Sequence, residues 1–164
     1  MTDPAVRPAS AEDADPVAVI WEAGWREVHT GEVPAALVDA RTSASFRRRA
    51  ADRVADTLVA VVDGAVVGFV MTEGDEVDQV YVAPTGRGTG AATALLSAAE
   101  ERIRSGGHRA AWLAVVGGNA RARAFYGRQG WVDEGEFSHD APGPDGPISV
   151  TAHRYVKDLA AAGD

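Results

Sequence analysis

A glycine-rich segment between a predicted strand and a predicted helix is the feature that most constrains the fold of this chain. The segment runs from Thr85 to Gly90, after the apolar strand pattern Val80–Val82, and it opens a helix pattern that continues to about Ser105. Small residues let the backbone approach a ligand closely, and a helix N-terminus offers free N–H donors and the positive end of the helix dipole. The sequence therefore predicts a strand–loop–helix unit that binds a phosphate or pyrophosphate.

Two common nucleotide-binding loops do not fit this segment. A Walker loop ends in Gly-Lys-Ser/Thr, whereas the one lysine of the chain is Lys157. A dinucleotide-binding loop follows the first strand, has the spacing G-x-G-x-x-G and is completed by an acidic residue about 20 positions later. Here the glycines give G-x-G-x-G, several predicted strands precede them, and residues 109–119 contain no acid. The loop therefore belongs to neither class.

The rest of the pattern predicts a mixed α/β sheet with helices on its faces. Apolar spacing and breakers indicate one helix that begins near Ser10 and ends before Gly31 and Pro34, and a second from about Ser43 to Ala55, with Arg47, Arg48 and Arg49 on a solvated face. The later segments are strands Thr57–Val62, Ala65–Thr72, Glu76–Val82 and Ala110–Val116, a helix from Asn119 to near Gly130, strands Trp131–Phe137 and Ile148–Val156, and an edge strand Ala5–Pro8.

Composition narrows the function classes. The 164 residues fit one domain spanning 1–164, and the absence of cysteine excludes disulfides, thiolate metal sites and a cysteine nucleophile. The four histidines have no ligand spacing, so no metal is expected. A net charge of −8 argues against nucleic acid and is compatible with a cationic substrate. Strand-length apolar stretches and the lack of a secretory signal lead us to expect a cytoplasmic protein that is not in a membrane.

Two motifs give the chain a family resemblance. The loop reads Arg87-Gly88-Thr89-Gly90-Ala91-Ala92 after Val80-Tyr81-Val82 and Pro84, and a later segment reads Asn119 to Phe125-Tyr126 followed by Gly130-Trp131. Both motifs and the order of the elements resemble the GNAT superfamily of acetyl-CoA-dependent N-acetyltransferases, over nearly the whole chain. The resemblance implies a mixed, mostly antiparallel twisted sheet with helices on both faces. It also implies transfer of an acetyl group from acetyl-CoA to a primary amine of a small molecule, peptide or protein by direct attack.

The resemblance also implies residue roles. Backbone groups of Val80 and Val82, with Tyr81 between them, would bind the pantetheine arm of acetyl-CoA as though it were an extra strand, and Asn119 would contact the same region. Arg87 would lie beside the phosphates, Tyr126 would protonate the departing thiolate, and a backbone N–H near Val80 would polarise the thioester carbonyl. The pyrophosphate would be held by the loop amides of Gly88, Thr89, Gly90, Ala91, Ala92 and Thr93.

The proton acceptor and the acceptor substrate stay open at this stage. Glu76 occupies the place of the family's general base, with Glu73, Asp75 and Asp78 as nearby rivals and water as an alternative route. Trp25 and His29 share a helix face that either stacks over the acceptor or belongs to the core. No segment specifies the amine. A homodimer stays open, and a non-catalytic acyl-CoA sensor is the alternative function.

Overall fold

One seven-stranded sheet runs through residues 3–159, which are the residues that the computed structural model describes. Its spatial order is β1-β2-β3-β4-β5-β7-β6, and every neighbouring pair is antiparallel except the parallel pair β4 and β5. The sheet is mixed and mostly antiparallel, which confirms the predicted fold class. The strands are β1 (Ala5–Pro8), β2 (Thr57–Val62), β3 (Ala65–Glu73), β4 (Glu76–Val82), β5 (Ala110–Val115), β6 (Val132–Ala141) and β7 (Ile148–Asp158).

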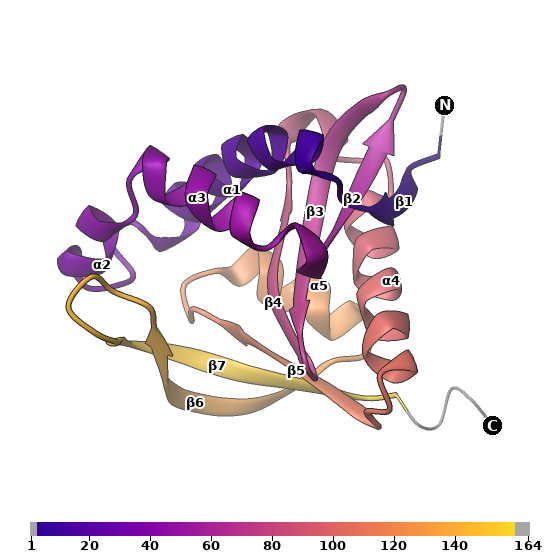
Figure 1. The fold of residues 1–164 in the computed structure, drawn as a ribbon. Helices are drawn as coiled ribbons and strands as arrows, with labels where there is room; N and C mark the ends of the chain where they lie inside the picture. The colour runs from indigo at the N-terminus through magenta and orange to yellow at the C-terminus, as the bar shows by residue number, and fades with distance from the viewer. Residues whose placement is uncertain (1–2, 160–164) are drawn as a thin grey trace.

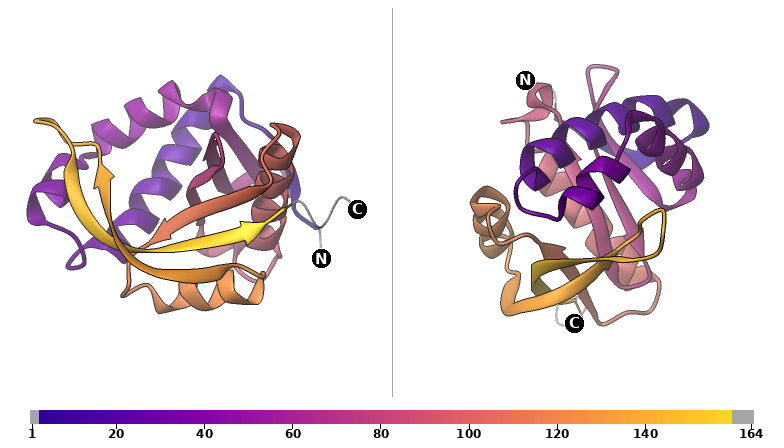
Figure 2. Two further views of the ribbon diagram at one scale, coloured as in Figure 1. Left: turned by 90° about the horizontal axis from the view of Figure 1, so that it is seen from below. Right: turned by 90° about the vertical axis from the view of Figure 1, so that its left-hand side faces the viewer.

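Helices cover both faces of this sheet (Figure 1). Helices α1 (Ala14–His29) and α3 (Ser43–Asp52) pack on one face, and α4 (Ala91–Ser105) and α5 (Ala120–Arg128) pack on the other. Side chains alternate along β3 and so contribute to the hydrophobic cores on both faces of the sheet. Phe69 and Met71 pack in the core under α1 and α3, whereas Val70 packs in the core under α4 and α5. The two views in Figure 2 show the sheet twisting between the two helical layers.

Most predicted elements occur where the sequence places them. The strands 57–62 and 76–82 match at both ends, and α1 is preceded by a short 3₁₀ turn, Ala11–Asp13, at the expected start. Two differences concern the site described below. A short helix, α2 (Ala35–Ala40), lies in the segment between the two predicted helices, and the β6–β7 hairpin extends its pairing to Ala141 and Ile148. The loop that joins β6 and β7 is therefore confined to residues 142–147.

The sheet opens between its two parallel strands. β4 and β5 pair only at Glu76 and Trp112, where the Trp112 amide also donates to the Asp75 carbonyl at 3.1 Å. Beyond this point the strands diverge, so the far half of β4 has a sheet neighbour on the β3 side alone. The divergence leaves room for ligands in the middle of the fold.

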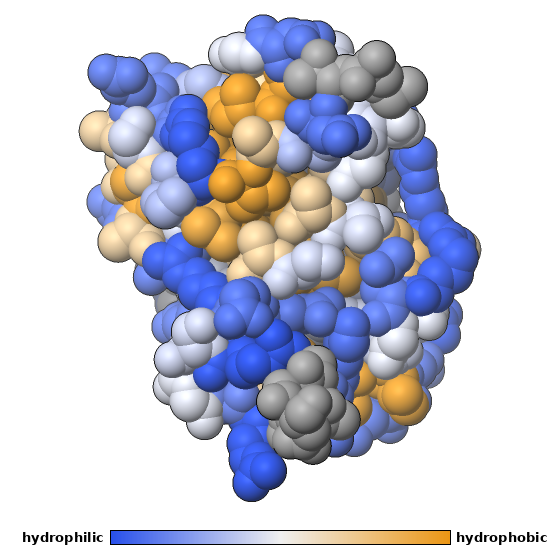
Figure 3. All heavy atoms as spheres, turned by 90° about the vertical axis from the view of Figure 1, so that its right-hand side faces the viewer, coloured by the Kyte–Doolittle hydropathy of each residue, from blue (hydrophilic) through white to orange (hydrophobic). Residues whose placement is uncertain are grey.

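The surface is mixed in character. The side that lies to the right in Figure 1 has an apolar area bordered by hydrophilic residues (Figure 3). Two large apolar side chains, Val19 and Val132, are strongly exposed. Within residues 3–159, no helix combines the length and the apolar character needed to span a bilayer.

Candidate active site

Two cavities flank the open half of β4 and share a wall. The β4–β5 cavity, of about 510 Å³, lies between the diverging strands and is bounded by α2, α3 and the β6–β7 loop. The loop cavity, of about 810 Å³, is bounded by the glycine-rich loop and the starts of α4 and α5. The side chains and backbone common to both belong to Val28, Val80, Tyr81, Asn119, Ala122 and Tyr126.

The glycine-rich loop presents unpaired amides to the loop cavity. Gly88 and Gly90 have φ values of +77° and +87°, a conformation that favours glycine, and no protein atom lies where a Cβ would project from either. In the described part of the chain, no acceptor lies within hydrogen-bonding distance of the amides of Gly88, Gly90, Ala92 and Thr93. Free amides at a helix N-terminus suit an anion, so the loop fits the predicted pyrophosphate.

Two other residues of the glycine-rich loop, Thr89 and Arg87, differ in their relation to the loop cavity. The Thr89 hydroxyl donates to the Gly86 carbonyl and accepts from the Ala91 amide at 3.3 Å, so Thr89 shapes the loop and does not line the cavity. Arg87 lines the loop cavity, where its guanidinium lies 3.7 Å from the Glu27 carboxylate. Arg87 therefore has its charge at the mouth of the predicted phosphate site.

The backbone of β4 offers hydrogen-bonding groups on its open edge. The Ala83 amide donates to Val67 of β3 at 2.8 Å. Since backbone groups of successive residues point to alternate sides, those of Val80 and Val82 face away from β3, toward the gap. The Tyr81 side chain instead packs under α1, where its ring lies against Gly24 and Phe69. The strand bulges at Asp78, two residues before Val80.

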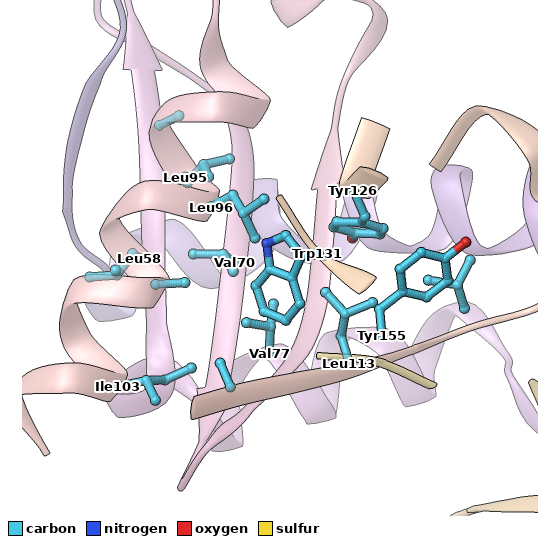
Figure 4. Packing of buried hydrophobic residues seen from close by; sticks show 14 of the residues in the cluster. Leu58, Val70, Val77, Leu95, Leu96, Ile103, Leu113, Tyr126, Trp131 and Tyr155 are labelled. Carbon is cyan, nitrogen blue, oxygen red and sulfur yellow. The ribbon is translucent and has the colours of Figure 1, made fainter. Parts of the chain in front are cut away.

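Asn119 and Tyr126 belong to the same helix, with Asn119 as the N-cap of α5 and Tyr126 near its C-terminal end. The Asn119 side chain caps α5 by accepting from the Ala122 amide at 3.2 Å, which fixes it on the shared wall. Tyr126 is 6% exposed and packs against Trp131 and Tyr155 at one end of the core cluster (Figure 4). Burial raises the pKa of the Tyr126 hydroxyl, so the group stays protonated at neutral pH.

The four candidate carboxylates have different surroundings. Burial, followed by the charges of Asp78 and Glu73, raises the pKa of Glu76 to about 7, and its side chain lines the β4–β5 cavity. Asp78 is held in an ion pair with Arg53, Asp75 accepts from the Trp112 indole at 3.0 Å, and Glu73 is exposed. Glu76 is thus the half-buried carboxylate of the four that can both hold and release a proton near neutral pH.

The predicted acceptor residues lie at the border between core and cavity. Trp25 is buried against Phe46. The His29 ring stacks on the Trp25 ring with their centroids 4.7 Å apart, and His29 Nδ1 lies 3.0 Å from the Trp25 carbonyl oxygen. Both also line the β4–β5 cavity. Desolvation lowers the pKa of His29, with smaller opposing and reinforcing effects from the Trp25 carbonyl and Arg41.

Arginines line the β4–β5 cavity at positions that the sequence pattern does not predict as part of a site. Arg47 and Arg48 are exposed as predicted, but Arg49 is not on the solvated face: its guanidinium lies over the Trp21 ring and lines the β4–β5 cavity. Arg41, at the end of the unpredicted α2, lines the same cavity. The period of α3 places Arg49 three residues after buried Phe46, which is the available sequence signal. In the described residues, no group of three or more histidines and carboxylates could hold a metal ion.

Comparison with known proteins gives consistent matches. Residues 20–131 match the family model described as the acetyltransferase (GNAT) family. An uncharacterized N-acetyltransferase of Mycobacterium tuberculosis is 36% identical over 107 residues, which cover 62% of this chain and 69% of that protein.

Solved structures of N-acetyltransferases share the fold over nearly the whole chain. An N-acetyltransferase of Rhodopseudomonas palustris has 25% identity and a TM-score of 0.73 over 96% of this chain and 97% of its own. The PaiA N-acetyltransferase of Thermoplasma acidophilum, solved in complex with coenzyme A, has 16% identity and a TM-score of 0.70 over 95% of this chain and 99% of its own.

Proposed function

The chain belongs to the acetyltransferase (GNAT) family, and we propose that it moves the acetyl group of acetyl-CoA to a primary amine by direct attack. The observation that carries this proposal is the wall shared by the two cavities. One cavity has the free amides for a pyrophosphate, and the other holds a carboxylate with a pKa of about 7. A thioester at the shared wall would be within reach of both.

The loop cavity would hold acetyl-CoA. The amides of Gly88, Gly90, Ala92 and Thr93 and the nearby Arg87 would bind the phosphates, because N–H donors and a guanidinium both favour oxyanions. The backbone of Val80 and Val82 would pair with the pantetheine amides along the open edge of β4, and Asn119 would contact the arm from α5. Acetyl-CoA supplies an activated acetyl group at the inner end of this path.

The β4–β5 cavity would hold the amine. Glu76 would accept a proton from the ammonium form, and the neutral amine nitrogen would bond to the thioester carbonyl carbon. An amide N–H of the open β4 edge near Val80 would stabilise the charge on the carbonyl oxygen. As the carbon–sulfur bond breaks, Tyr126 would donate its proton to the thiolate, and the attacking nitrogen would lose its second proton to the resulting tyrosinate, directly or through solvent, so that the products are an N-acetyl amine and CoA. The raised pKa of the Tyr126 hydroxyl keeps that proton in place until the thiolate forms.

Release of the CoA thiol across a panel of primary amines tests the proposal. We expect thiol release that depends on the amine, together with an amine product heavier by one acetyl group in the mass spectrum. Tight binding of acetyl-CoA with no amine-dependent thiol release on any acceptor would contradict it. That outcome would favour the non-catalytic acyl-CoA sensor, which needs neither Glu76 nor Tyr126.

A further inference from the structure

Two arginines line the β4–β5 cavity without a carboxylate partner in the described residues. Arg41 is 6% exposed; its Nη2 donates to the Pro142 carbonyl at 2.8 Å, and its Nε has no partner. The Arg49 guanidinium lies 4.4 Å from the centroid of the Trp21 ring, and its buried Nη1 also has no partner. A third arginine in the cavity, Arg53, differs because it has ion pairs with Asp78 and Asp56.

The two guanidiniums lie partly desolvated in a cavity that Glu73, Glu76, Asp78 and Asp140 also line, and neither forms an ion pair with these carboxylates in the described residues. Desolvation, followed by the charge of Arg41, lowers the pKa of Arg49 to about 10, while the charge of Asp78 opposes the shift. Burying a guanidinium without a counter-ion is costly, and unpaired N–H donors add to that cost. An anion bound in the cavity would offset both. The free donors thus point to a ligand that carries negative charge.

We propose that Arg41 and Arg49 bind the carboxylate of the acceptor, so that the substrate is a small amine that also bears an acid group, as a free amino acid does. The proposal rests on the proposed function, because Glu76 in the same cavity would receive the ammonium end. The planar fork of arginine matches a carboxylate with two parallel hydrogen bonds. A volume of about 510 Å³ suits a small molecule.

The phosphates of CoA do not account for these arginines. Neither Arg41 nor Arg49 lines the loop cavity, where the free amides of the glycine-rich loop lie. Arg41 comes from the end of α2 and is attached to the β6–β7 loop through Pro142, whereas Arg49 comes from the middle of α3. The anion that they bind therefore belongs to whatever enters the β4–β5 cavity.

Matched acceptors test the proposal directly. The kcat/KM of acetyl transfer is measured for the twenty L-amino acids and for their carboxamides, in which the acid group alone is neutralised. We expect the best amino acid to exceed its amide by about 10- to 100-fold, the range of a charge-assisted hydrogen bond. Aminophosphonic acids form a third arm, which separates a carboxylate site from a general oxyanion site.

Arginine variants assign that preference to residues. R41Q and R49Q should bring the acid-to-amide ratio close to one, through the KM for the acid, while R49K keeps part of it. R48Q removes an exposed arginine of the same helix and should leave the ratio unchanged. Thermal denaturation and CoA affinity report whether each variant is folded. If R41Q is unfolded, R41K and R49Q carry the test.

Binding gives a readout that is independent of turnover. Calorimetry with CoA-loaded protein compares the binding of N-acetyl amino acids with that of their carboxamides. Neither set of compounds has a free amine that could react. If the acids bind and R41Q weakens their binding by about 10-fold or more, the anion site is supported. This holds even if no amine is acetylated, because the lack of acetylation would contradict the proposed function and not the anion site. Equal acetylation of acids and amides, or failure of every N-acetyl amino acid to bind, would overturn the inference.

Discussion

Glu76 shows how the surroundings of one residue select among several similar ones. Four carboxylates cluster around the β3–β4 turn, yet three of them are exposed or already paired. Glu76 alone combines a position in the β4–β5 cavity with a pKa raised to about 7, chiefly by burial. The ionised form, which would serve as the base in the proposed reaction, is therefore about half populated near neutral pH.

Replacing Glu76 with glutamine should remove the base while keeping the size of the side chain. For the wild-type protein, we expect kcat/KM to rise with pH as Glu76 ionises around pH 7. E76Q should lower turnover near pH 7 by about 10²–10⁴. The deficit should shrink toward pH 10, where solvent deprotonates an amine whose reference pKa is about 10.4. Full pH–rate profiles of both proteins give the comparison. A deficit that is constant at all pH values would mean that Glu76 positions the acceptor.

The stability of the same variant serves as its control. A raised pKa in the folded state means that the folded protein binds more protons than the unfolded chain between pH 4.5, the ordinary pKa of a glutamate, and about pH 7, so stability falls as pH rises through that window. E76Q lacks this loss and should be more stable than wild type above pH 7, on the order of 1–3 kcal/mol, with little difference below pH 4. Urea unfolding at the two pH values measures it.

Removing the Tyr126 hydroxyl should separate chemistry from packing. Y126F keeps the ring against Trp131 and Tyr155, and no described residue hydrogen-bonds to the hydroxyl, so stability and CoA binding should change little. We expect kcat to fall by about 10²–10⁴ because the thiolate then leaves unprotonated. Steady-state kinetics with the best acceptor measures it. An unchanged kcat would show that water or another group protonates the thiolate.

At the scale of the element, the glycine-rich loop and the divergence of β4 from β5 differ in how far the sequence predicts them. The loop can be predicted from the sequence, because its glycines and the helix start lie at neighbouring positions in the chain. The divergence of β4 from β5 cannot be predicted in this way, because Val80 and Val82 have the pattern of an ordinary strand whether or not a partner strand lies beside them. The open edge depends on pairing that stops after Glu76 and Trp112, which is a tertiary fact.

A substitution in the loop should separate ligand binding from folding. A side chain at Gly90 meets no protein atom and would project into the space that the phosphates need, although the positive φ adds strain. G90V should therefore weaken CoA binding by about 10-fold or more, measured by calorimetry, in a protein that still folds. Gly86 makes the contrast, because its Cβ would lie 2.8 Å from Val82 and 2.9 Å from Val67, so G86V should disrupt the fold itself. Unchanged affinity in G90V would refute the loop assignment.

The contact between α1 and β4 has its own test. A Cβ on Gly24 would clash with the Tyr81 ring, so G24A must displace a side chain on the shared wall. We expect a loss of about 1–3 kcal/mol in the free energy of unfolding. Gly127 is an exposed helical glycine with no atom near its Cβ position, and G127A should be neutral or stabilising by up to about 1 kcal/mol. Denaturant unfolding compares the two. Equal effects would mean that Tyr81 moves aside without cost.

At the scale of the whole molecule, the sequence predicts the class of the fold, which the structure confirms, and the residues that we propose for binding the cofactor. Strand and helix periods are local, and the motif residues from Arg87 to Tyr126 come from consecutive segments. The acceptor side was not predictable in the same way. Arg41 and Arg49 approach β4 from helices that lie far from it in the chain, and the loop at Pro142 completes the cavity wall beside Arg41. Only tertiary packing brings these three segments together.

A crystal structure of the protein with acetyl-CoA would show directly whether one thioester is reached from both cavities. We expect the pyrophosphate on the amides of Gly88, Gly90, Ala92 and Thr93, the pantetheine arm along the open edge of β4, and the thioester at the shared wall. There the Tyr126 hydroxyl should lie within hydrogen-bonding distance of the sulfur, and the carbonyl carbon should face the β4–β5 cavity. A thioester outside that wall, or acetyl-CoA bound elsewhere on the protein, would contradict the account.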